Sequence, residues 1–100
     1  MAKFDVHRLR RGTGLVVDCQ SNLNASLATR VVVPLVRRRL LPVPLSPRLN
    51  PVVTIGGEAF VVAVQALQTI ATRDLAERVT SLIEHDRIIA DALDALFFGI

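Results

Sequence analysis

The chain has no Trp and no Tyr, and it contains only four Phe and one cysteine, Cys19. A lone cysteine excludes an intrachain disulfide and a metal site built from several cysteines, and it suits a reducing cytoplasm. Four phenylalanines offer few rings on which nucleic-acid bases could stack. No apolar run approaches the roughly 20 residues of a membrane helix, and residues 1–12 lack the apolar core of a signal peptide. We therefore expect a soluble, cytoplasmic protein with no membrane partner.

Charged residues are also scarce, at 21% of the 100 residues, whereas hydrophobic residues reach 51%. A chain of this length forms one domain, and small domains bury a smaller fraction of their surface than large ones. An excess of Val and Leu at this size indicates that part of the apolar surface is covered by a second chain. We expect a single domain over residues 1–100 that forms a homodimer.

The charges are distributed unevenly along the chain. Residues 1–50 hold nine Lys or Arg and two acids, a net +7, whereas residues 51–100 hold three Arg and seven acids, a net −4. The basic half includes Arg8, Arg10 and Arg11 and the run Arg37, Arg38 and Arg39. Such a face attracts phosphates or an acidic protein segment. A run of solvated side chains is the simpler interpretation, and we expect DNA to be reached only indirectly, through another protein.

Thirteen of the fourteen valines precede residue 65, which predicts strands first and a helix last. Alternating apolar residues predict a half-buried strand at 3–7, and a Gly-Thr-Gly turn at 12–14 leads into a second strand at 15–19. In the segment 31–36, the residues that would point to one face of a strand and those that would point to the other are all apolar, so we expect both of its faces to be covered. Within it, Pro34 requires a bulge or a sheet edge, where its missing N–H costs nothing.

Four of the five prolines fall between residues 42 and 51, which predicts an irregular loop. Two strands at 52–55 and 58–64 follow, joined by a Gly-Gly turn at 56–57 that suits positive φ at both positions. Residues 66–80 fit either strand or helix.

The last segment has the period of an amphipathic helix that packs on the preceding strands. Ser81 and Glu84 have the spacing of a capping box, and Gly99 suits a left-handed cap. The predicted apolar stripe consists of Ile88, Ile89, Ala92, Leu93, Leu96 and Phe97, with Asp86, Asp91 and Asp94 on the solvent side. The predicted fold class is mainly β with a C-terminal α-helix.

No pattern typical of an enzyme site emerges. His7 and His85 form an acid and base pair for RNA cleavage only if the fold brings them together, and a structural role for His85 is the more economical interpretation. Cys19 has no neighbouring base and reads as a small core residue. The turn at 12–14 lacks the Gly-Lys ending of a phosphate loop. We expect no catalytic residues, no metal and no cofactor.

The C-terminus presents two alternatives. Phe97 falls on the apolar stripe, whereas Phe98 is rotated from it by about 100° and Ile100 lies beyond the cap. On this pattern alone, a frayed helix end tucked onto the surface is favoured, and a projecting apolar plug that binds a partner comes second.

Four segments, in order and at matching spacing across the whole chain, resemble the CcdB family, the toxins of bacterial toxin–antitoxin pairs that poison DNA gyrase. The matching segments are Val17-Asp18-Cys19-Gln20-Ser21, Arg30-Val31-Val32-Val33-Pro34-Leu35, Pro51-Val52-Val53-Thr54-Ile55-Gly56 and Phe97-Phe98-Gly99-Ile100.

The resemblance implies an SH3-like β-barrel with a C-terminal helix, arranged as a homodimer whose two chain ends emerge side by side. It further implies a non-enzymatic toxin of a type II toxin–antitoxin system. In the family, the chain ends bind the DNA gyrase A subunit and trap the complex of gyrase with cleaved DNA. A cognate CcdA-like antitoxin folds its disordered tail onto the toxin and removes it.

Carried over by position, the gyrase-binding residues are Phe98, Gly99 and Ile100, with Leu23 and Asp94 in support. Three positions depart from the family pattern. Phe98 stands where Trp is familiar, and its smaller π-face weakens a contact with a cation. Asp94 replaces an Asn and can only accept hydrogen bonds. Asn24 stands where an apolar residue is familiar.

Three functions therefore remain in competition. The first is a gyrase-binding toxin. The second is a ribonuclease toxin on a related barrel, suggested by the two histidines and many arginines. The third is a CcdB-like protein that has lost gyrase binding and keeps only antitoxin binding.

Overall fold

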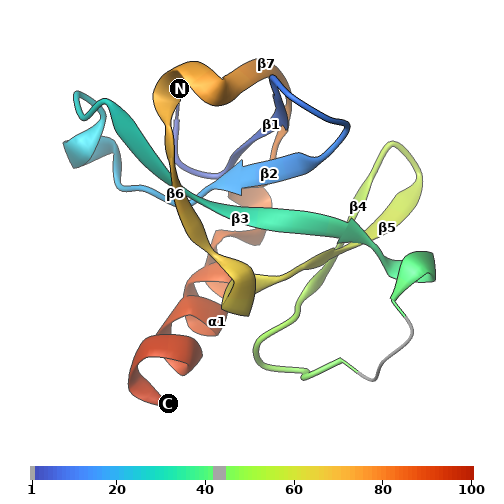
Figure 1. The fold of residues 1–100 in the computed structure, drawn as a ribbon. Helices are drawn as coiled ribbons and strands as arrows, with labels where there is room; N and C mark the ends of the chain where they lie inside the picture. Colours follow the sequence, from blue (N-terminus) through green and yellow to red (C-terminus); the bar gives the residue numbers. More distant parts are fainter. Residues whose placement is uncertain (1, 42–44) are drawn as a thin grey trace.

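The computed structural model describes residues 2–41 and 45–100, and its strands come first and its helix last (Figure 1). The long elements are β1 (Asp5–Leu9), β2 (Leu15–Asp18), β3 (Thr29–Arg37), β4 (Val52–Ile55), β5 (Glu58–Val62), β6 (Gln68–Ala71), β7 (Leu75–Ser81) and α1 (Asp86–Phe98). The predicted mainly β class with a C-terminal helix is confirmed. The predicted loop at 42–51 falls partly outside the described residues.

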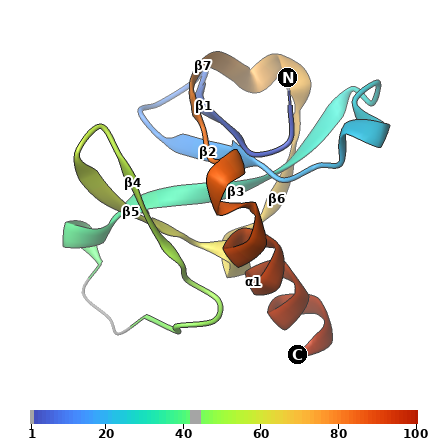
Figure 2. The same cartoon turned by 180° about the vertical axis from the view of Figure 1, so that it is seen from behind.

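The strands form one antiparallel sheet, curled into a half-barrel, in the order β4-β5-β3-β2-β1-β7. The long strand β3 lies at its centre and changes partner along its length. Its first half pairs with β6, which lies off the main path, and its last three residues pair with β5. Helix α1 covers the face of this sheet that is turned to the viewer in Figure 2.

Pro34 lies within central β3, neither at a sheet edge nor at a bulge in its pairing with β2, so the predicted placement was wrong. On the other side of β3, pairing with β6 ends at Val32 and pairing with β5 begins at Leu35. The Pro34 carbonyl accepts from the Ala63 N–H at 3.0 Å in this interval. Because the N–H and C=O of one strand residue point to the same side, the missing N–H falls where no ladder bond is required.

The predicted hairpin of β4 and β5 is confirmed, although β5 ends at Val62 rather than at residue 64. Gly56 and Gly57 have φ of 60° and 81°. Both values lie in the left-handed region, which glycine reaches without strain.

The core occupies both faces of the sheet, because neighbouring residues of β2 and β3 are buried in opposite directions. Val33 belongs to the larger cluster and Val32 to a smaller one, and both are fully buried. This confirms the predicted cover on both faces of 31–36. The larger cluster contains Phe4, Val6, Val17, Val33, Leu35, Val53, Phe60, Val62, Val64, Leu82, Ile89 and Ala92. The smaller contains Val16, Val32 and Leu75.

The first three residues of β1 are buried on both faces rather than half-buried as predicted. Asp5 and His7 are as inaccessible as Val6 between them. Pairing with β7 explains the difference, because Asp5 forms an ion pair with Arg78 of that strand, with 3.1 Å between Oδ1 and Nε. The His7 Nδ1 lies 3.0 Å from the Ala76 carbonyl oxygen. Partners of this kind replace water for Asp5 and for one nitrogen of His7, whereas the His7 Nε2 is buried with no hydrogen-bond partner among the described residues.

The ambiguous stretch 66–80 is mostly strand. A 3-10 turn at Val64–Ala66 precedes β6, and another at Thr72–Asp74 joins β6 to β7.

Helix α1 begins later than the predicted capping box. Ser81 ends β7, and its hydroxyl oxygen accepts from the Ile83 N–H at 3.2 Å, at the start of a 3-10 turn (η5, Ile83–His85) that precedes the helix. The N-cap of α1 is His85, which makes no side-chain capping bond, so the predicted capping box was wrong. The C-terminal cap is confirmed, because Gly99 has φ of 71° and donates to the Ala95 carbonyl. Among the described residues, no helix combines the length and the apolar character needed to cross a membrane.

A buried ion pair connects β2 to β3. Arg30 is 1% exposed, and both its Nε and its Nη2 donate to Oδ2 of the fully buried Asp18. The other oxygen, Oδ1, accepts from the Gln20 N–H at 3.0 Å. The Asp18 carbonyl also accepts from the N–H of Phe4, a residue held at a φ of 70°. Charge and hydrogen-bonding capacity are thus largely satisfied inside the molecule.

Removing one partner of this pair should destabilise the fold strongly. Asp18→Ala leaves the Arg30 guanidinium buried without a counter-charge, and we expect the free energy of unfolding to fall by about 3–5 kcal/mol. Urea denaturation of the wild type and the variant measures this loss. The double variant Asp18→Leu/Arg30→Met carries no buried charge and should recover part of it. A single variant as stable as the wild type would contradict the role of the pair.

Cys19 packs against the larger cluster, as predicted for a small core side chain. Burial, and then the charge of Asp18, raise the pKa of its thiol from 9.0 to about 12. We expect slow reaction with iodoacetamide at a pH near 9.0 in the folded protein and fast reaction in urea.

The same shift predicts a pH dependence of stability. The unfolded chain loses the thiol proton first, so the free energy of unfolding should fall as the pH rises from 9.0 towards 12. The variant Cys19→Ser should lack this contribution. Equal labelling rates in the folded and unfolded states would contradict the burial.

Candidate functional site

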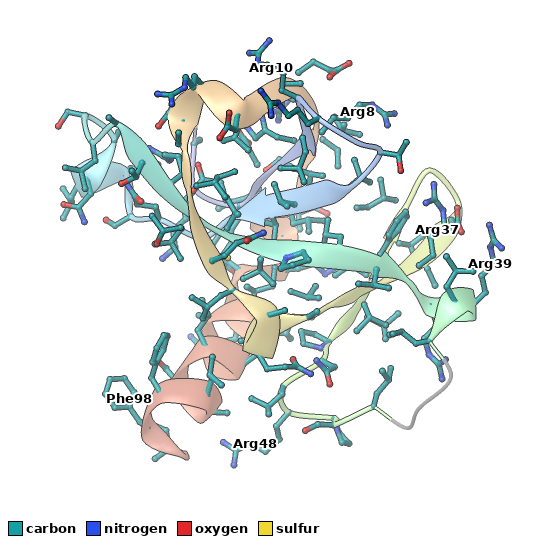
Figure 3. All side chains as sticks on the ribbon, in the orientation of Figure 1. Arg8, Arg10, Arg37, Arg39, Arg48 and Phe98 are labelled. Carbon is teal, nitrogen blue, oxygen red and sulfur yellow. The ribbon has the colours of Figure 1, made fainter. Side chains whose placement is uncertain are left out.

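The C-terminal end of α1 exposes large apolar side chains. Phe98 is 73% exposed, Ile100 67% and Phe97 62%. The helix remains regular to Phe98, and Figure 3 shows the Phe98 ring projecting from its far end. The favoured alternative of a frayed, tucked end was therefore wrong, as was the placement of Phe97 on the buried stripe. The last turn of α1 extends beyond the sheet (Figures 1 and 2), and there Leu96 still packs against the larger cluster, whereas Phe97 and Phe98 stay exposed.

We call Phe98, Gly99 and Ile100 the terminal trio. The left-handed conformation of Gly99 turns the chain at the end of α1 and so determines the direction in which Ile100 leaves the helix. An added Cβ at Gly99 would meet no atom within 4 Å. The glycine therefore serves backbone conformation rather than close packing.

Leu23 is 94% exposed on a 3-10 turn, η1 (Asn22–Asn24). The Ser21 hydroxyl oxygen accepts from the Leu23 N–H at 3.1 Å, and Gln20 donates its side-chain amide to the Asn24 carbonyl at 2.8 Å. Both views show η1 well separated from the end of α1, near the top of the molecule, whereas the helix ends at the bottom (Figures 1 and 2). Within one chain, the fold does not bring Leu23 to the terminal trio.

Asp94, by contrast, lies near the trio. Asp94 and Ile100 line a groove of about 580 Å³ between α1 and the segment 47–52. Figure 3 shows Arg48 beside the end of α1. The groove is lined by Pro47, Arg48, Pro51, Val52, Ile88, Asp91, Asp94 and Ile100. Arg48 and Val52 carried no signal in the sequence, because only the fold of the proline-containing segment places them against the helix.

The arginine run is partly neutralised within the chain. Arg37 and Arg39 each donate from Nε to a Glu58 carboxylate oxygen at 3.2 Å. Desolvation opposes ionisation of Glu58, but the two guanidinium groups outweigh it and hold the pKa of this carboxyl below its ordinary value. Arg37 also lies over the ring of Phe60, 5.4 Å from its centre.

Arg8 in β1 and Arg10 just after it occupy another part of the surface. Arg10 donates to the carbonyls of Arg73 and Leu75, and Arg8 lies 3.9 Å from Glu77. In Figure 3, Arg8 and Arg10 lie over β1 and β7, whereas Arg37 and Arg39 lie where β3 ends. The arginines thus form two separate groups on the surface, and members of each group bind carboxylate or carbonyl oxygens of the same chain.

The two histidines have different environments. His7 is 4% exposed, which leaves its ring inaccessible to a substrate. His85 is half-buried in η5 and lines a hollow of about 480 Å³ that also contains Glu84, Ser81, Thr80 and Thr54. The hypothetical pair of His7 and His85 is therefore not available on the surface. Within residues 2–41 and 45–100, no group of three or more His, Cys, Asp or Glu is arranged to hold a metal.

Two solved structures share this fold at low sequence identity. One, titled "Mycobacterium tuberculosis toxin MazF-mt6", is 17% identical, with a TM-score of 0.74 over 93% of this chain and 95% of its own. The other, titled "Endoribonuclease in complex with its cognate antitoxin from Mycobacterial species", is 16% identical, with a TM-score of 0.76 over 100% and 96%. At such identities the likeness establishes the fold alone.

Comparison with protein families identifies the family, which the likeness in fold does not. The family model described as "CcdB protein" matches residues 3–99. This range includes the buried pair Asp18 and Arg30, the Gly-Gly hairpin, and all of α1 with its glycine cap. The chain therefore belongs to the CcdB family.

Proposed function

We propose that this protein is a toxin that binds the DNA gyrase A subunit through its terminal trio and traps gyrase on cleaved DNA. The observation that carries the proposal is the exposure of Phe98 and Ile100 at the end of a regular helix. Large apolar side chains that project together are typical of a binding surface. Membership of the CcdB family supports the choice of target.

The proposed mechanism requires binding and no catalysis by this chain. Burying one large apolar side chain against a partner contributes roughly 1.5–3 kcal/mol. Phe98 and Ile100 would supply this energy on either side of the Gly99 turn. A toxin held in this way opposes religation by occupying the gyrase subunit while its DNA is cut. The proposal places the protein in the cytoplasm, and DNA is contacted only through gyrase.

The proposal also includes a homodimer, which would present two terminal trios to a two-fold symmetric target. Apolar side chains elsewhere on the surface support it, because Leu27 and Ile83 are exposed and lie outside the trio. A C2 interface uses the same patch on both copies. In a dimer, Leu23 of one copy would be able to contact the target beside the terminal trio of the other copy.

A cognate CcdA-like antitoxin completes the proposal. A disordered segment can wrap a large surface when it folds on binding, which suits removal of a toxin from its target. A protein that binds such an antitoxin but leaves gyrase unaffected would instead be a family member that has lost gyrase binding.

Substituting Phe98 should separate binding from folding. With purified gyrase and supercoiled plasmid, we expect the wild type to accumulate linear DNA. We expect Phe98→Ala to require at least about tenfold more protein, because a large apolar contact is lost. Phe98→Trp should act at lower concentration than the wild type, because indole offers a cation a larger π-face.

The control is Leu40→Ala, which removes an exposed apolar side chain remote from the trio in sequence and should leave cleavage unchanged. A chain lacking residues 98–100 should no longer inhibit bacterial growth while remaining folded and dimeric. Persistent toxicity of that truncated chain would rule out the mechanism. Wild-type protein that is folded yet traps no cleaved DNA would favour loss of gyrase binding.

A ribonuclease is the second candidate. The hollow that holds His85, Glu84 and the hydroxyls of Ser81, Thr80 and Thr54 gathers groups able to transfer protons and contact phosphate. One structural neighbour is titled an endoribonuclease, which gives the candidate a precedent for this fold.

This candidate predicts cleavage of RNA that depends on His85 alone. Purified protein would be incubated with messenger RNA, and His85→Ala should reduce the cleavage rate by about 100-fold or more if His85 is a general acid or base. His7→Gln is the matched control, because His7 is buried and cannot reach RNA. Intact RNA with the wild type, or equal cleavage by His85→Ala, eliminates this candidate.

A further inference from the structure

The groove between α1 and the segment 47–52 combines an apolar floor with charged rims. We call it the α1 groove. Ile88, Val52 and Ile100 supply apolar surface, and each is more than two-fifths exposed. Asp91 and Asp94 line the groove from the helix, and Arg48 lines it from the segment 47–52. Its volume of about 580 Å³ accommodates several side chains of a partner.

The carboxylates of this groove have no counter-charge within the described part of the chain. Among residues 2–41 and 45–100, no hydrogen bond or ion pair reaches the side chain of Asp91, Asp94 or Arg48. The arginines near Glu58 and Glu77 behave differently, because they form ion pairs. The groove lining contains two carboxylates and one guanidinium, and Arg87, one turn before Asp91 on α1, is not part of that lining and forms no ion pair among the described residues. The lining therefore carries an excess of negative charge.

The position of the two acids on α1 adds to this excess. Residues three apart lie on the same side of a helix, where like charges repel each other. The C-terminal end of a helix is itself partly negative, and the last turn of α1 contains no basic residue. A cation supplied from outside would therefore be stabilised by both carboxylates and by the helix.

The α1 groove is continuous with the terminal trio. Ile100 belongs to both, and Asp94, carried over as a supporting target contact, lies on the groove rim. A target segment that covers Phe98 and Ile100 would pass beside Asp91. We propose that the α1 groove binds a segment of the toxin's protein target in which an arginine or lysine is flanked by apolar residues, and that Asp91 determines this preference. The inference rests on the proposed function.

Substitutions of Asp91 test the proposal in the full-length protein. The affinity for purified gyrase A subunit would be measured by calorimetry at low and high salt. We expect Asp91→Lys to weaken binding roughly tenfold at low salt, and Asp91→Asn to weaken it less, because charge complementarity governs such contacts. The salt dependence of affinity should shrink in both variants. Asp86→Asn is the matched control, since Asp86 is an exposed acid of the same helix that lies outside the groove.

The outcomes distinguish the groove from the proposed function. If Phe98→Ala loses binding while Asp91→Lys binds like the wild type, the groove proposal fails and the proposed function stands. If Asp91→Lys instead dissociates a homodimer in sedimentation experiments, a second copy covers the groove and the proposal is also overturned.

Wild-type protein that does not bind gyrase A would overturn the proposed function and leave the groove to be tested by itself. The probes are two capped peptides, Leu-Arg-Leu and Leu-Glu-Leu, added to isotope-labelled protein. The arginine peptide alone should shift the amide signals of Ile88, Asp91 and Ile100, and this shift should disappear in Asp91→Lys. Equal shifts with both peptides, or none with either, would refute the cation preference.

Discussion

The ion pair between Asp18 and Arg30 is the constraint on which much of this structure depends. It connects the end of β2 to the start of β3, and the second carboxylate oxygen of Asp18 accepts from the Gln20 N–H. Gln20 in turn accepts from the Val31 N–H and donates to the Asn24 carbonyl, so the same network supports the turn that exposes Leu23. The Asp18 carbonyl also restrains Phe4 in its left-handed conformation. Buried charge is costly alone and tolerated here because nearly every polar group has a partner.

The apolar side chains at the end of α1 are exposed because the helix is longer than the surface it covers. Its middle packs through Ile89 and Ala92, and its last turn has no sheet beneath it. The apolar residues there remain on the surface, next to two acids without internal partners. A small domain thereby presents a projecting apolar end and a charged groove side by side, on a helix anchored in the core.

Local rules predicted those elements whose reasons are local. Two adjacent glycines specified the turn of the β4 and β5 hairpin, and Gly99 specified the end of α1. The same rules failed where a distant strand intervened. Asp5 and His7 are polar in sequence, yet β7 buries them by providing partners. Pro34 is tolerated in a central strand because it lies between the part of β3 that pairs with β6 and the part that pairs with β5.

The sequence by itself determined the order of strands and helix, the two glycine turns, the family, and the identity of the terminal residues. These depend on residue type and on neighbours a few positions away. Only the tertiary structure decided that Phe97 and Phe98 are exposed, that Leu23 lies apart from them, and that Arg48 and Asp91 line the same groove. A periodic pattern shows which helix face is apolar, but the extent of the opposing surface decides how much of that face is buried.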